Sequence, residues 1–201
     1  KSISHQIETI YIDDLPADGD VLVAVEYSTV NYKDGLCLAG KGGLVRTYPH
    51  IPGIDFAGEV VDSKDARYAP GDKVVLTGWR VGEIWWGGYA QYARVKADWL
   101  VPLPDGLTCE QTMAVGTAGI TAMLSVLALE RHGVAVDDGP ILVTGAGGGV
   151  GSLATALLAE AGFEVAAVTG RSEMTPYLQK LGASTIIDRN SLMDGDSKPL
   201  M

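Results

Sequence analysis

The sequence predicts an α/β fold in which a small β-barrel precedes a parallel sheet covered by helices. Between about residues 7 and 104, short β-rich runs are broken by Gly, Pro and Asp, which is typical of a barrel or rolled sheet. After Thr108, apolar strands alternate with helical stretches, and this order indicates βαβ units. We expect a boundary near residues 105–115, which gives a first domain over residues 1–110 and a second over residues 111–201.

The strands of the first half are indicated by runs of Val, Leu, Tyr and Phe that are bounded by turn residues. They are expected at residues 21–27, 56–61, 74–76 and 87–95, with one short helix near residues 32–38. The sequence Pro-Gly-Asp at residues 70–72 precedes the third of these strands, as a turn should.

The second half is expected to begin with a helix. Thr108 and Gln111 have the spacing of a capping box, and the helix should run to about Arg131. The next elements are expected as strand 140–144, turn 145–151, helix 152–161, strand 164–169, helix 172–181 and strand 185–188. Because the sequence stops just after this third strand, we expect the second domain to be part of a larger sheet.

Composition argues against several classes of protein. A net charge of −10 disfavours nucleic acid as a partner, because phosphate binding needs a basic face. No uninterrupted apolar run reaches the roughly 18 residues that suggest a membrane span, so we expect no membrane partner and a cytoplasmic protein. Cys37 and Cys109 are too far apart for a CxxC pair and are expected to be buried free thiols, with a disulfide as the alternative. The three His residues lack metal-binding spacing, which indicates no metal site.

The strongest motif is the glycine-rich turn Gly-Ala-Gly-Gly-Gly-Val-Gly at residues 145–151, which follows an apolar strand and opens a helix. In a dinucleotide-binding turn, Gly148 would let the backbone approach a pyrophosphate and Gly151 would let the helix pack close to the strand. Ala146 stands where a strict GxGxxG has its first glycine. The alternative is a glycine loop without a ligand. The residues expected to bind the cofactor here are Gly147, Gly148, Gly149 and Val150.

The end of the next strand discriminates between cofactors. NAD-binding domains usually carry Asp or Glu there for the ribose 2′-hydroxyl, whereas this chain has Thr169, Gly170, Arg171 and Ser172. A guanidinium forms charge-assisted hydrogen bonds to a 2′-phosphate, so the sequence predicts NADPH. Arg189, after the following strand, is a second candidate for the same phosphate. The alternative for Arg171 is a solvated surface arginine.

Several segments together resemble one known family. They are Asn-Tyr-Lys-Asp-Gly-Leu at residues 31–36, Pro-Gly-Ile-Asp-Phe-Ala-Gly-Glu-Val at 52–60, Pro-Gly-Asp-Lys-Val at 70–74, Gly-Gly-Tyr-Ala-Gln-Tyr at 87–92, Gly-Thr-Ala-Gly-Ile-Thr-Ala at 116–122, and the stretch 143–151. In this order they resemble medium-chain dehydrogenases/reductases. Residues 76–83 with Trp-Gly-Gly at 86–88 further resemble the acrylyl-CoA reductase subgroup, described as quinone oxidoreductase-like.

The resemblance implies a GroES-like catalytic domain, followed by a Rossmann domain whose C-terminal part lies outside this sequence. It also implies NADPH as cofactor and a homodimer. Zinc-dependent members of the family hold their catalytic metal through residues that match Asn31, Ile54 and Thr117 here. An isoleucine cannot be a metal ligand, and the four-cysteine lobe of those members is missing, so the resemblance points to the branch without zinc.

The resemblance implies a reaction in which acryloyl-CoA and NADPH give propanoyl-CoA. Hydride adds to the β-carbon, negative charge moves to the thioester oxygen, and a proton reaches the α-carbon from a side chain or water. Tyr32 is the candidate catalytic residue beside the nicotinamide, with a core tyrosine as the alternative, and Asn31 and Asp34 would shape its pocket.

Further residues are weaker candidates for the substrate site. Trp79, Trp85 and Trp86 either line a substrate cleft or serve packing, and Lys41, Arg46 and Arg80 are candidates for the phosphates of CoA. Two other functions stay open. One is an NADPH quinone oxidoreductase or a general 2-enoyl or 2-alkenal reductase, and the other is a non-catalytic NADPH-binding protein.

Overall fold

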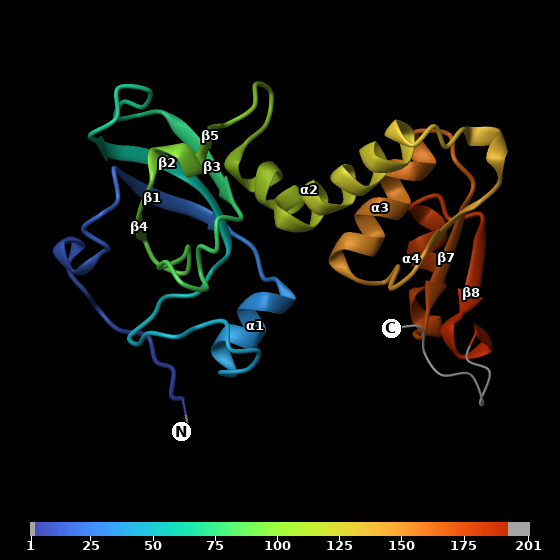
Figure 1. Cartoon of the computed structure of the whole chain (residues 1–201), viewed down its shortest axis with the longest axis horizontal. Coiled ribbons are helices and arrows are strands. Elements are labelled where there is room, and N and C mark those ends of the chain that lie inside the picture. Colours follow the sequence, from blue (N-terminus) through green and yellow to red (C-terminus); the bar gives the residue numbers. More distant parts are fainter. Residues whose placement is uncertain (1–2, 193–201) are drawn as a thin grey trace. The chain divides into compact units, whose positions relative to one another are not determined.

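A computed structural model describes residues 3–192 of the chain. It divides between Thr117 and Ala118 into two compact units, and each is described by itself (Figure 1). The second half of the chain has the alternation of strands and helices that the sequence predicts. The first unit holds the antiparallel sheet and the second unit holds the parallel one.

The first unit is a five-stranded sheet with the order β4-β1-β2-β3-β5, in which all pairs are antiparallel. Its strands are β1 (Val21–Ser28), β2 (Asp55–Ser63), β3 (Lys73–Thr77), β4 (Tyr92–Val95) and β5 (Leu100–Pro102), and its helix is α1 (Tyr32–Leu38). Two short 3-10 turns also occur, Ile12–Asp14 before β1 and Ala97–Trp99 between β4 and β5.

The prediction of a strand over residues 87–95 is wrong for residues 87–91. Gly87 donates its N–H to the carbonyl of Ile51 at 2.7 Å, and Gly88 donates to the carbonyl of Gly53 at 2.9 Å. A Cβ at Gly87 would lie 2.3 Å from the carbonyl oxygen of Gly53. The two glycines therefore pack against the loop before β2, and the strand begins only at Tyr92.

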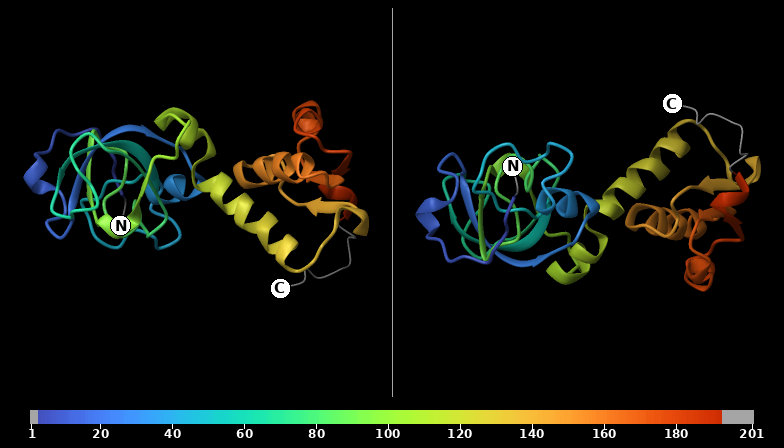
Figure 2. Two further views of the ribbon diagram at one scale, coloured as in Figure 1. Left: turned by 90° about the horizontal axis from the view of Figure 1, so that it is seen from above. Right: turned by 90° about the horizontal axis from the view of Figure 1, so that it is seen from below.

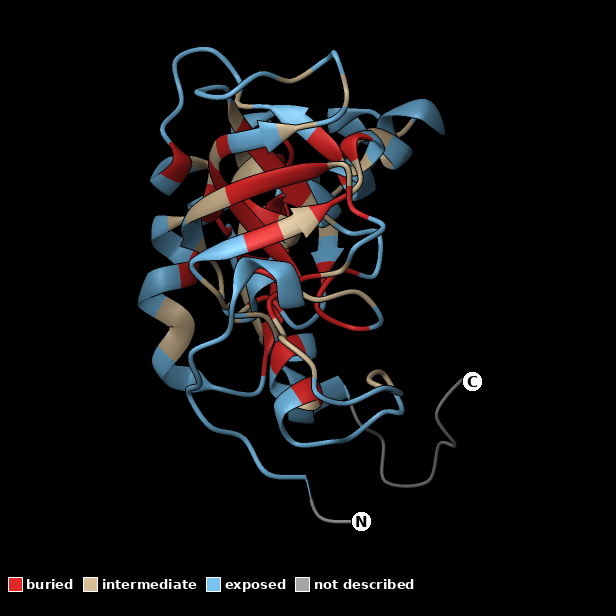
Figure 3. Ribbon diagram, turned by 90° about the vertical axis from the view of Figure 1, so that its left-hand side faces the viewer, coloured by how far each residue is buried: buried red, intermediate tan, exposed pale blue. Residues whose placement is uncertain are grey.

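The core of the first unit lies between the strands. Alternate residues of β1 point inward, so that Val21 and Val23 are fully buried, and Phe56, Val74 and Leu76 from β2 and β3 are buried beside them. Figure 3 shows buried residues in red along the strands, with exposed residues on the surrounding loops.

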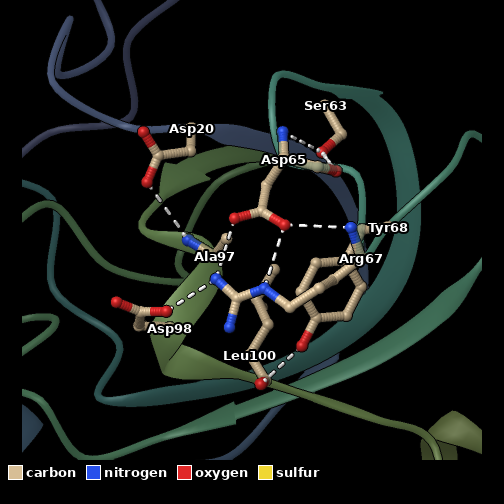
Figure 4. Close-up of polar contacts among 8 residues, drawn as sticks. All are labelled: Asp20, Ser63, Asp65, Arg67, Tyr68, Ala97, Asp98 and Leu100. Atoms are coloured by element: carbon tan, nitrogen blue, oxygen red, sulfur yellow. Dashed lines mark hydrogen bonds and ion pairs between the residues drawn. The ribbon is translucent and has the colours of Figure 1, made fainter.

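One side of this unit is tied by a surface ion-pair network (Figure 4). The guanidinium of Arg67 contacts Asp65 at 2.8 Å and Asp98 at 2.6 Å, and Tyr68 donates its hydroxyl to the carbonyl of Leu100 at 2.7 Å. The Arg67 guanidinium lowers the pKa of Asp65 to about 2. Since Arg67 and Asp98 are exposed and Asp65 is only partly buried, the ion pairs contribute little to stability.

The second unit has three parallel strands in the order β6-β7-β8. They are β6 (Ile141–Val143), β7 (Val165–Thr169) and β8 (Thr185–Asp188), with α3 (Gly149–Glu160) and α4 (Thr175–Lys180) as the connecting helices. All five residues of β7 are buried, and Leu158 of α3 and Leu178 of α4 pack in the same core. Figure 2 shows α3, in orange, beside the strands that it connects.

Two helix boundaries differ from those expected. The helix after the glycine turn begins at Gly149 instead of residue 152. The prediction placed the start too late because glycine has a low helix propensity, although the first turn of a helix tolerates it. The helix expected over residues 172–181 is a 3-10 turn at Ser172–Met174 followed by α4. Pro176 lies in the first turn of α4, where its fixed φ and missing N–H are compatible with a helix start.

The helix after Thr108, α2 (Cys109–Arg131), is broken at Gly116, whose φ of 52° and ψ of −161° are not helical. Among the described residues it is the one helix long and apolar enough to cross a membrane by length and composition, although no membrane span was expected from the sequence. The part after the break has about 15 residues and would be about 22 Å long. That is shorter than the roughly 30 Å hydrocarbon core of a bilayer.

Candidate active site

The glycine turn connects β6 to α3 with close backbone packing. Gly148 is the N-cap of α3. A Cβ at Gly151 would lie 2.5 Å from the carbonyl oxygen of Gly145 and 2.7 Å from the Cα of Ala146. Because both contacts are with backbone, only glycine lets α3 begin this close to the strand.

The turn lines an open groove of about 470 Å³ in the second unit. Gly145, Gly148 and Val150 form one side of the groove, and Val126 of α2 and Leu142 of β6 contribute apolar side chains. The first N–H groups of a helix have no intrahelical partner and carry the positive end of the helix dipole. The start of α3 therefore offers donors for an anionic group at this groove.

Two arginines lie at the carboxyl ends of β7 and β8. Arg171 donates its Nη2 to the carbonyl oxygen of Gly147 at 2.6 Å and its backbone N–H to Thr169 Oγ1 at 3.2 Å. A Cβ at Gly170 would lie 2.8 Å from Nη2 of Arg189, so that guanidinium rests on Gly170. The structure thus brings together the glycine turn, the segment 169–172 and Arg189, all of which were predicted from the sequence.

An acid at the same sheet edge was not predicted. Asp188, the last residue of β8, pairs in register with Thr169 and accepts the backbone N–H of Asn190 at 2.9 Å. It could have been found from the sequence, because it is an Asp at the end of the third expected strand and directly precedes Arg189.

Tyr32 is the first residue of α1 in the first unit, and its side chain is 86% exposed. The alternative of a core tyrosine is therefore wrong. The backbone around it is fixed by Asp34, which is fully buried. Asp34 accepts the N–H of Asn31 at 2.9 Å and those of Gly53 and Ile54 at 3.1 and 3.0 Å.

Two of the three residues that the family resemblance matches to zinc-ligand positions, Asn31 and Thr117, bond one carboxylate, that of Asp55. Asn31 Nδ2 lies 3.3 Å from each of its oxygens, and the backbone N–H of Thr117 donates to Oδ2 at 2.9 Å. Ile54 is buried with 6% exposure. Within residues 3–192, no three His, Cys, Asp or Glu side chains form a group that could hold a metal ion.

Asp55 was not predicted from the sequence either. Its signal is an acid directly between Ile54 and Phe56 in an apolar strand, a place where a charged residue is expensive unless it has hydrogen-bond partners. The segments that supply those partners lie far away in the chain, so the partners themselves could not be predicted from the pattern.

Three of the four tryptophans of the first unit pack against one another. The ring centroids of Trp79 and Trp99 are 6.2 Å apart, and those of Trp85 and Trp99 are 5.0 Å apart. Trp85 donates its indole N–H to the carbonyl of Arg94 at 2.8 Å. Trp85 thus has a packing role, whereas Trp79 remains 59% exposed.

The candidate cations for CoA lie in different surroundings. Arg80 and Lys33 both contact the buried carboxylate of Glu83, at 3.5 and 2.9 Å, whereas Lys41 and Arg46 are exposed on the loop after α1.

The first unit also contains a larger open groove, of about 1220 Å³, between the extended segment 5–12 and the strands β1 and β4. Its lining includes Trp86 but, among the described residues, neither Tyr32 nor Asp55. The groove nevertheless adjoins that region, because its lining residue Ser28 donates its hydroxyl to the backbone carbonyl of Asp55 at 2.7 Å.

Cys37 and Cys109 are free and buried, as expected. Burial raises the pKa of both thiols, which makes them poor nucleophiles.

Comparison with known proteins identifies the fold. Residues 17–105 match the family model of the alcohol dehydrogenase GroES-like domain. The chain is 64% identical over 194 residues to the acrylyl-CoA reductase AcuI of Ruegeria pomeroyi, and this alignment covers 96% of the chain and 58% of that protein. The chain belongs to the medium-chain dehydrogenase/reductase family. It spans about three fifths of the length of three relatives that are 64%, 53% and 49% identical to it.

Two solved structures match the chain over nearly its whole length. The crystal structure of Escherichia coli K-12 YhdH with bound NADPH has a TM-score of 0.92 and 52% identity, over 97% of this chain and 59% of that one. Bacillus subtilis YhfP with bound NAD also has a TM-score of 0.92, with 49% identity over 100% of this chain and 61% of that one. The architecture is therefore a GroES-like domain followed by a Rossmann-type domain.

Proposed function

We propose that the protein is an NADPH-dependent reductase that converts acryloyl-CoA to propanoyl-CoA without a metal. The observation that carries the choice of substrate is the 64% identity to an acrylyl-CoA reductase across 96% of the chain. The proposal that no metal takes part is supported by residue identity. The side chain of Ile54 has no atom that can bind a metal, and the side chain of Asn31 already bonds Asp55.

The residues at the glycine turn fit NADPH. A Cβ at Gly147 would lie 2.9 Å from Nη2 of Arg171 and one at Gly148 would lie 3.3 Å from the carbonyl of Gly145, so both glycines keep space that a side chain would fill. The start of α3 supplies N–H donors for the pyrophosphate. Arg171 and Arg189 supply the positive charge that a 2′-phosphate requires. Because a relative has been solved with bound NAD, the preference of this protein for NADPH over NADH is to be measured directly.

When bound, NADPH would supply the hydride. The chain's own residues contribute binding and orientation. The backbone of residues 147–150 would hold the pyrophosphate, and Arg171 would leave the carbonyl of Gly147 to meet the 2′-phosphate. Arg171 is exposed, so this rotation costs little packing. Tyr32 presents an exposed phenol that can donate a hydrogen bond to the developing negative charge on the thioester oxygen or pack against the nicotinamide.

The acceptor is tested by NADPH oxidation on the full-length protein with acryloyl-CoA, a simple quinone and a 2-alkenal. We expect kcat/KM for acryloyl-CoA to exceed the other two by at least about tenfold. A preference for the quinone or the alkenal would instead support the general oxidoreductase function. Cofactor binding without oxidation in any of the three assays would support the non-catalytic alternative.

The cofactor is tested by Arg171→Ala. Loss of charge-assisted hydrogen bonds worth about 1.5–3 kcal/mol should raise the KM for NADPH by about ten- to a hundredfold and leave the KM for NADH nearly unchanged. Equal effects on both cofactors would reject the 2′-phosphate role.

The role of Tyr32 is tested by Tyr32→Phe, which keeps the ring and removes the hydroxyl. A fall in kcat/KM of about tenfold or more would assign charge stabilisation to the hydroxyl as a positioned donor. Unchanged kinetics would limit the residue to packing. The homodimer and the cytoplasmic location stay predictions, and size-exclusion chromatography with light scattering tests the first.

A further inference from the structure

Asp55 is a fully buried acid whose carboxylate is surrounded by hydrogen-bond donors of the first unit. Thr29 Oγ1 donates to Oδ1 at 2.6 Å, the backbone N–H of Thr117 donates to Oδ2 at 2.9 Å, and Asn31 Nδ2 lies 3.3 Å from both oxygens. These donors are a hydroxyl, a backbone N–H and a carboxamide, all neutral. Within residues 3–192 Asp55 forms no salt bridge. Buried carboxylates are tolerated when their oxygens are hydrogen-bonded in this way.

The donors bring together three segments that are distant in the chain. Thr29 and Asn31 lie in the stretch between β1 and α1, Asp55 begins β2, and Thr117 follows the break in α2. We call this set, with Gly116, the Asp55 corner. Asn31 Nδ2 also donates to Thr29 Oγ1 at 2.7 Å. The corner is thus a connected network in which the side chains of Thr29, Asn31 and Asp55 each have more than one partner.

One branch of the corner fixes the backbone that presents Tyr32. Asn31 is the N-cap residue of α1 and directly precedes Tyr32. Its side chain is held by Asp55, and its backbone N–H is held by Asp34 at 2.9 Å. Asp34 in turn accepts the N–H of Ile54, next to Asp55, at 3.0 Å. Asp34, in α1, thus binds the segment before β2, and Asp55, at the start of β2, binds the segment before α1. These two links fix the start of α1, and neither of them involves the exposed side chain of Tyr32.

The other branch fixes the point where α2 resumes. Gly116 is not helical, so Thr117 begins the second stretch of α2, and Asp55 accepts the N–H at that point. A carboxylate at the start of a helix satisfies a donor that has no intrahelical partner and interacts favourably with the helix dipole. Space is tight, since a Cβ at Gly116 would lie 3.1 Å from Thr29 Cγ2 and 3.2 Å from Asp55 Oδ2.

We propose that Asp55 is a positioning residue for the reduction, whose carboxylate holds Asn31, next to Tyr32, and the resumption of α2 in one geometry. This inference rests on the proposed function. It predicts that the corner governs turnover but not cofactor affinity, since none of its residues belongs to the glycine turn or to the segment 169–172.

The main variant is Asp55→Asn in the full-length protein. In a carboxamide of the same shape one of the two oxygens becomes an NH2 group, so either Thr29 or Thr117 loses its acceptor and Asn31 keeps only one of its two contacts. Since a displacement of about 1 Å can cost about a hundredfold in rate, we expect kcat with acryloyl-CoA to fall by about a hundredfold. The dissociation constant of NADPH, measured by fluorescence titration, should stay within about twofold, because the turn itself is unchanged.

A matched pair at Thr29 keeps the test independent of the folding of Asp55→Asn. Thr29→Val has nearly the same shape but no hydroxyl, and we expect a loss in kcat of about tenfold from the missing bond to Asp55. Thr29→Ser keeps the hydroxyl and should recover kcat to within about threefold of the wild type. Equal kcat in Thr29→Val and Thr29→Ser would overturn the proposal.

Val60→Ala controls for a loss of stability alone. Val60 is buried in β2 with 1% exposure and belongs to the main core of the first unit, so its truncation destabilises the same sheet without touching the corner. The proposal predicts a lower melting temperature with kcat preserved. A loss of kcat in Val60→Ala equal to that in Asp55→Asn, or a rise in the NADPH dissociation constant parallel to the loss of kcat, would reduce Asp55 to a structural residue.

A readout without activity separates this inference from the proposed function. If the wild-type enzyme oxidises NADPH with none of the three acceptors, the proposed function fails. The corner is then tested by amide hydrogen exchange in peptides that cover residues 29–36 and 113–121. Asp55→Asn should accelerate exchange in both peptides by about tenfold or more and leave the peptides of residues 145–172 unchanged. Unchanged exchange in the first two peptides would overturn the positioning role.

Discussion

The Asp55 corner and the glycine turn differ in where their negative charge comes from. In the corner, the chain supplies both the anion and its donors, and Asp55 is fully buried. At the glycine turn, Gly148, Gly149 and Val150 are exposed at the start of α3, and the Arg171 side chain bonds a backbone carbonyl there. The first arrangement is complete in the free protein and serves to hold segments in place. The second is complete only when an anion from outside is bound.

The difference also shows in which residues must be glycine. In the corner, Gly116 is needed because of its backbone conformation, with a φ of 52°. At the turn, Gly151 is needed because backbone atoms of residues 145 and 146 lie within 2.9 Å of the place of its Cβ. Substitutions at these positions therefore separate backbone strain from steric exclusion.

The largest effect is expected for Gly151→Ala. The new Cβ would collide with two backbone atoms of the turn, at 2.5 and 2.7 Å, and the collision cannot be relieved by a side-chain rotation. We expect the free energy of unfolding of the second unit to fall by about 3 kcal/mol, as measured by urea denaturation. Gly148→Ala is the control. Its Cβ would have one contact, at 3.3 Å, so stability should fall by less than about 1 kcal/mol while NADPH affinity falls. Equal stability losses would contradict the steric role of Gly151.

A somewhat smaller loss is expected for Gly116→Ala, which tests the corner. An alanine there would adopt a backbone conformation that costs about 1–3 kcal/mol, and we expect the free energy of unfolding to fall by about 2 kcal/mol. Gly35→Ala is the matched control. Gly35 lies within α1, and a methyl group on its Cα would have nothing within 4 Å, so alanine should stabilise the helix by about 0.5–1 kcal/mol. A neutral Gly116→Ala would show that the break in α2 does not depend on glycine.

The second arginine sharpens the description of the turn as an incomplete anion site. Arg189→Ala should raise the KM for NADPH by about three- to tenfold, less than Arg171→Ala, because Arg189 rests on Gly170 and not on the glycine turn. Arg131→Ala, at the last turn of α2, serves as the control for a general loss of positive charge. Steady-state kinetics at constant ionic strength provides the measurement, and a KM that Arg131→Ala changes as much as Arg189→Ala would argue against a local role.

The smallest effect is expected on the melting temperature, from the surface ion pair between Asp65 and Arg67. Arg67 lowers the pKa of Asp65 from 3.8 to about 2. A lowered carboxyl pKa contributes stability that is fully present above the unfolded value and is lost as the pH falls through the folded value. The melting temperature of the wild type should therefore slightly exceed that of Asp65→Asn at pH 7, and the difference should shrink below about pH 4. A difference that is still undiminished near about pH 2 would mean that the ion pair is not its source.

The order of the strands and helices could be predicted because it depends on local patterns. The run at residues 165–169 is almost uniformly apolar, and the run at residues 149–160 has helical composition, so the βαβ order was visible. The break in α2 was missed because a single glycine inside a helical stretch is commonly tolerated, and Gly116 has no sequence feature that separates it from Gly119 three residues later. Its cause lies in contacts with Thr29 and Asp55, which propensity does not contain.

The same reason explains the outcome for the site. The cofactor-binding residues predicted in the second unit lie within one βαβ unit and its following strand, so spacing sufficed to name them, and the structure brings them together. The donors of Asp55 come from 26, 24 and 62 residues away in the chain. A sequence shows that a buried acid needs partners, but it does not show which distant residues will be its partners.

The position of β6 has a consequence for handling the protein. This strand is at one end of the order β6-β7-β8, and Leu142 in its middle is 54% exposed. A strand in that position offers backbone groups and an apolar side chain to any other extended segment. A preparation of these 201 residues alone should therefore form intermolecular sheets as its concentration rises, and Leu142→Lys should keep it in solution for longer.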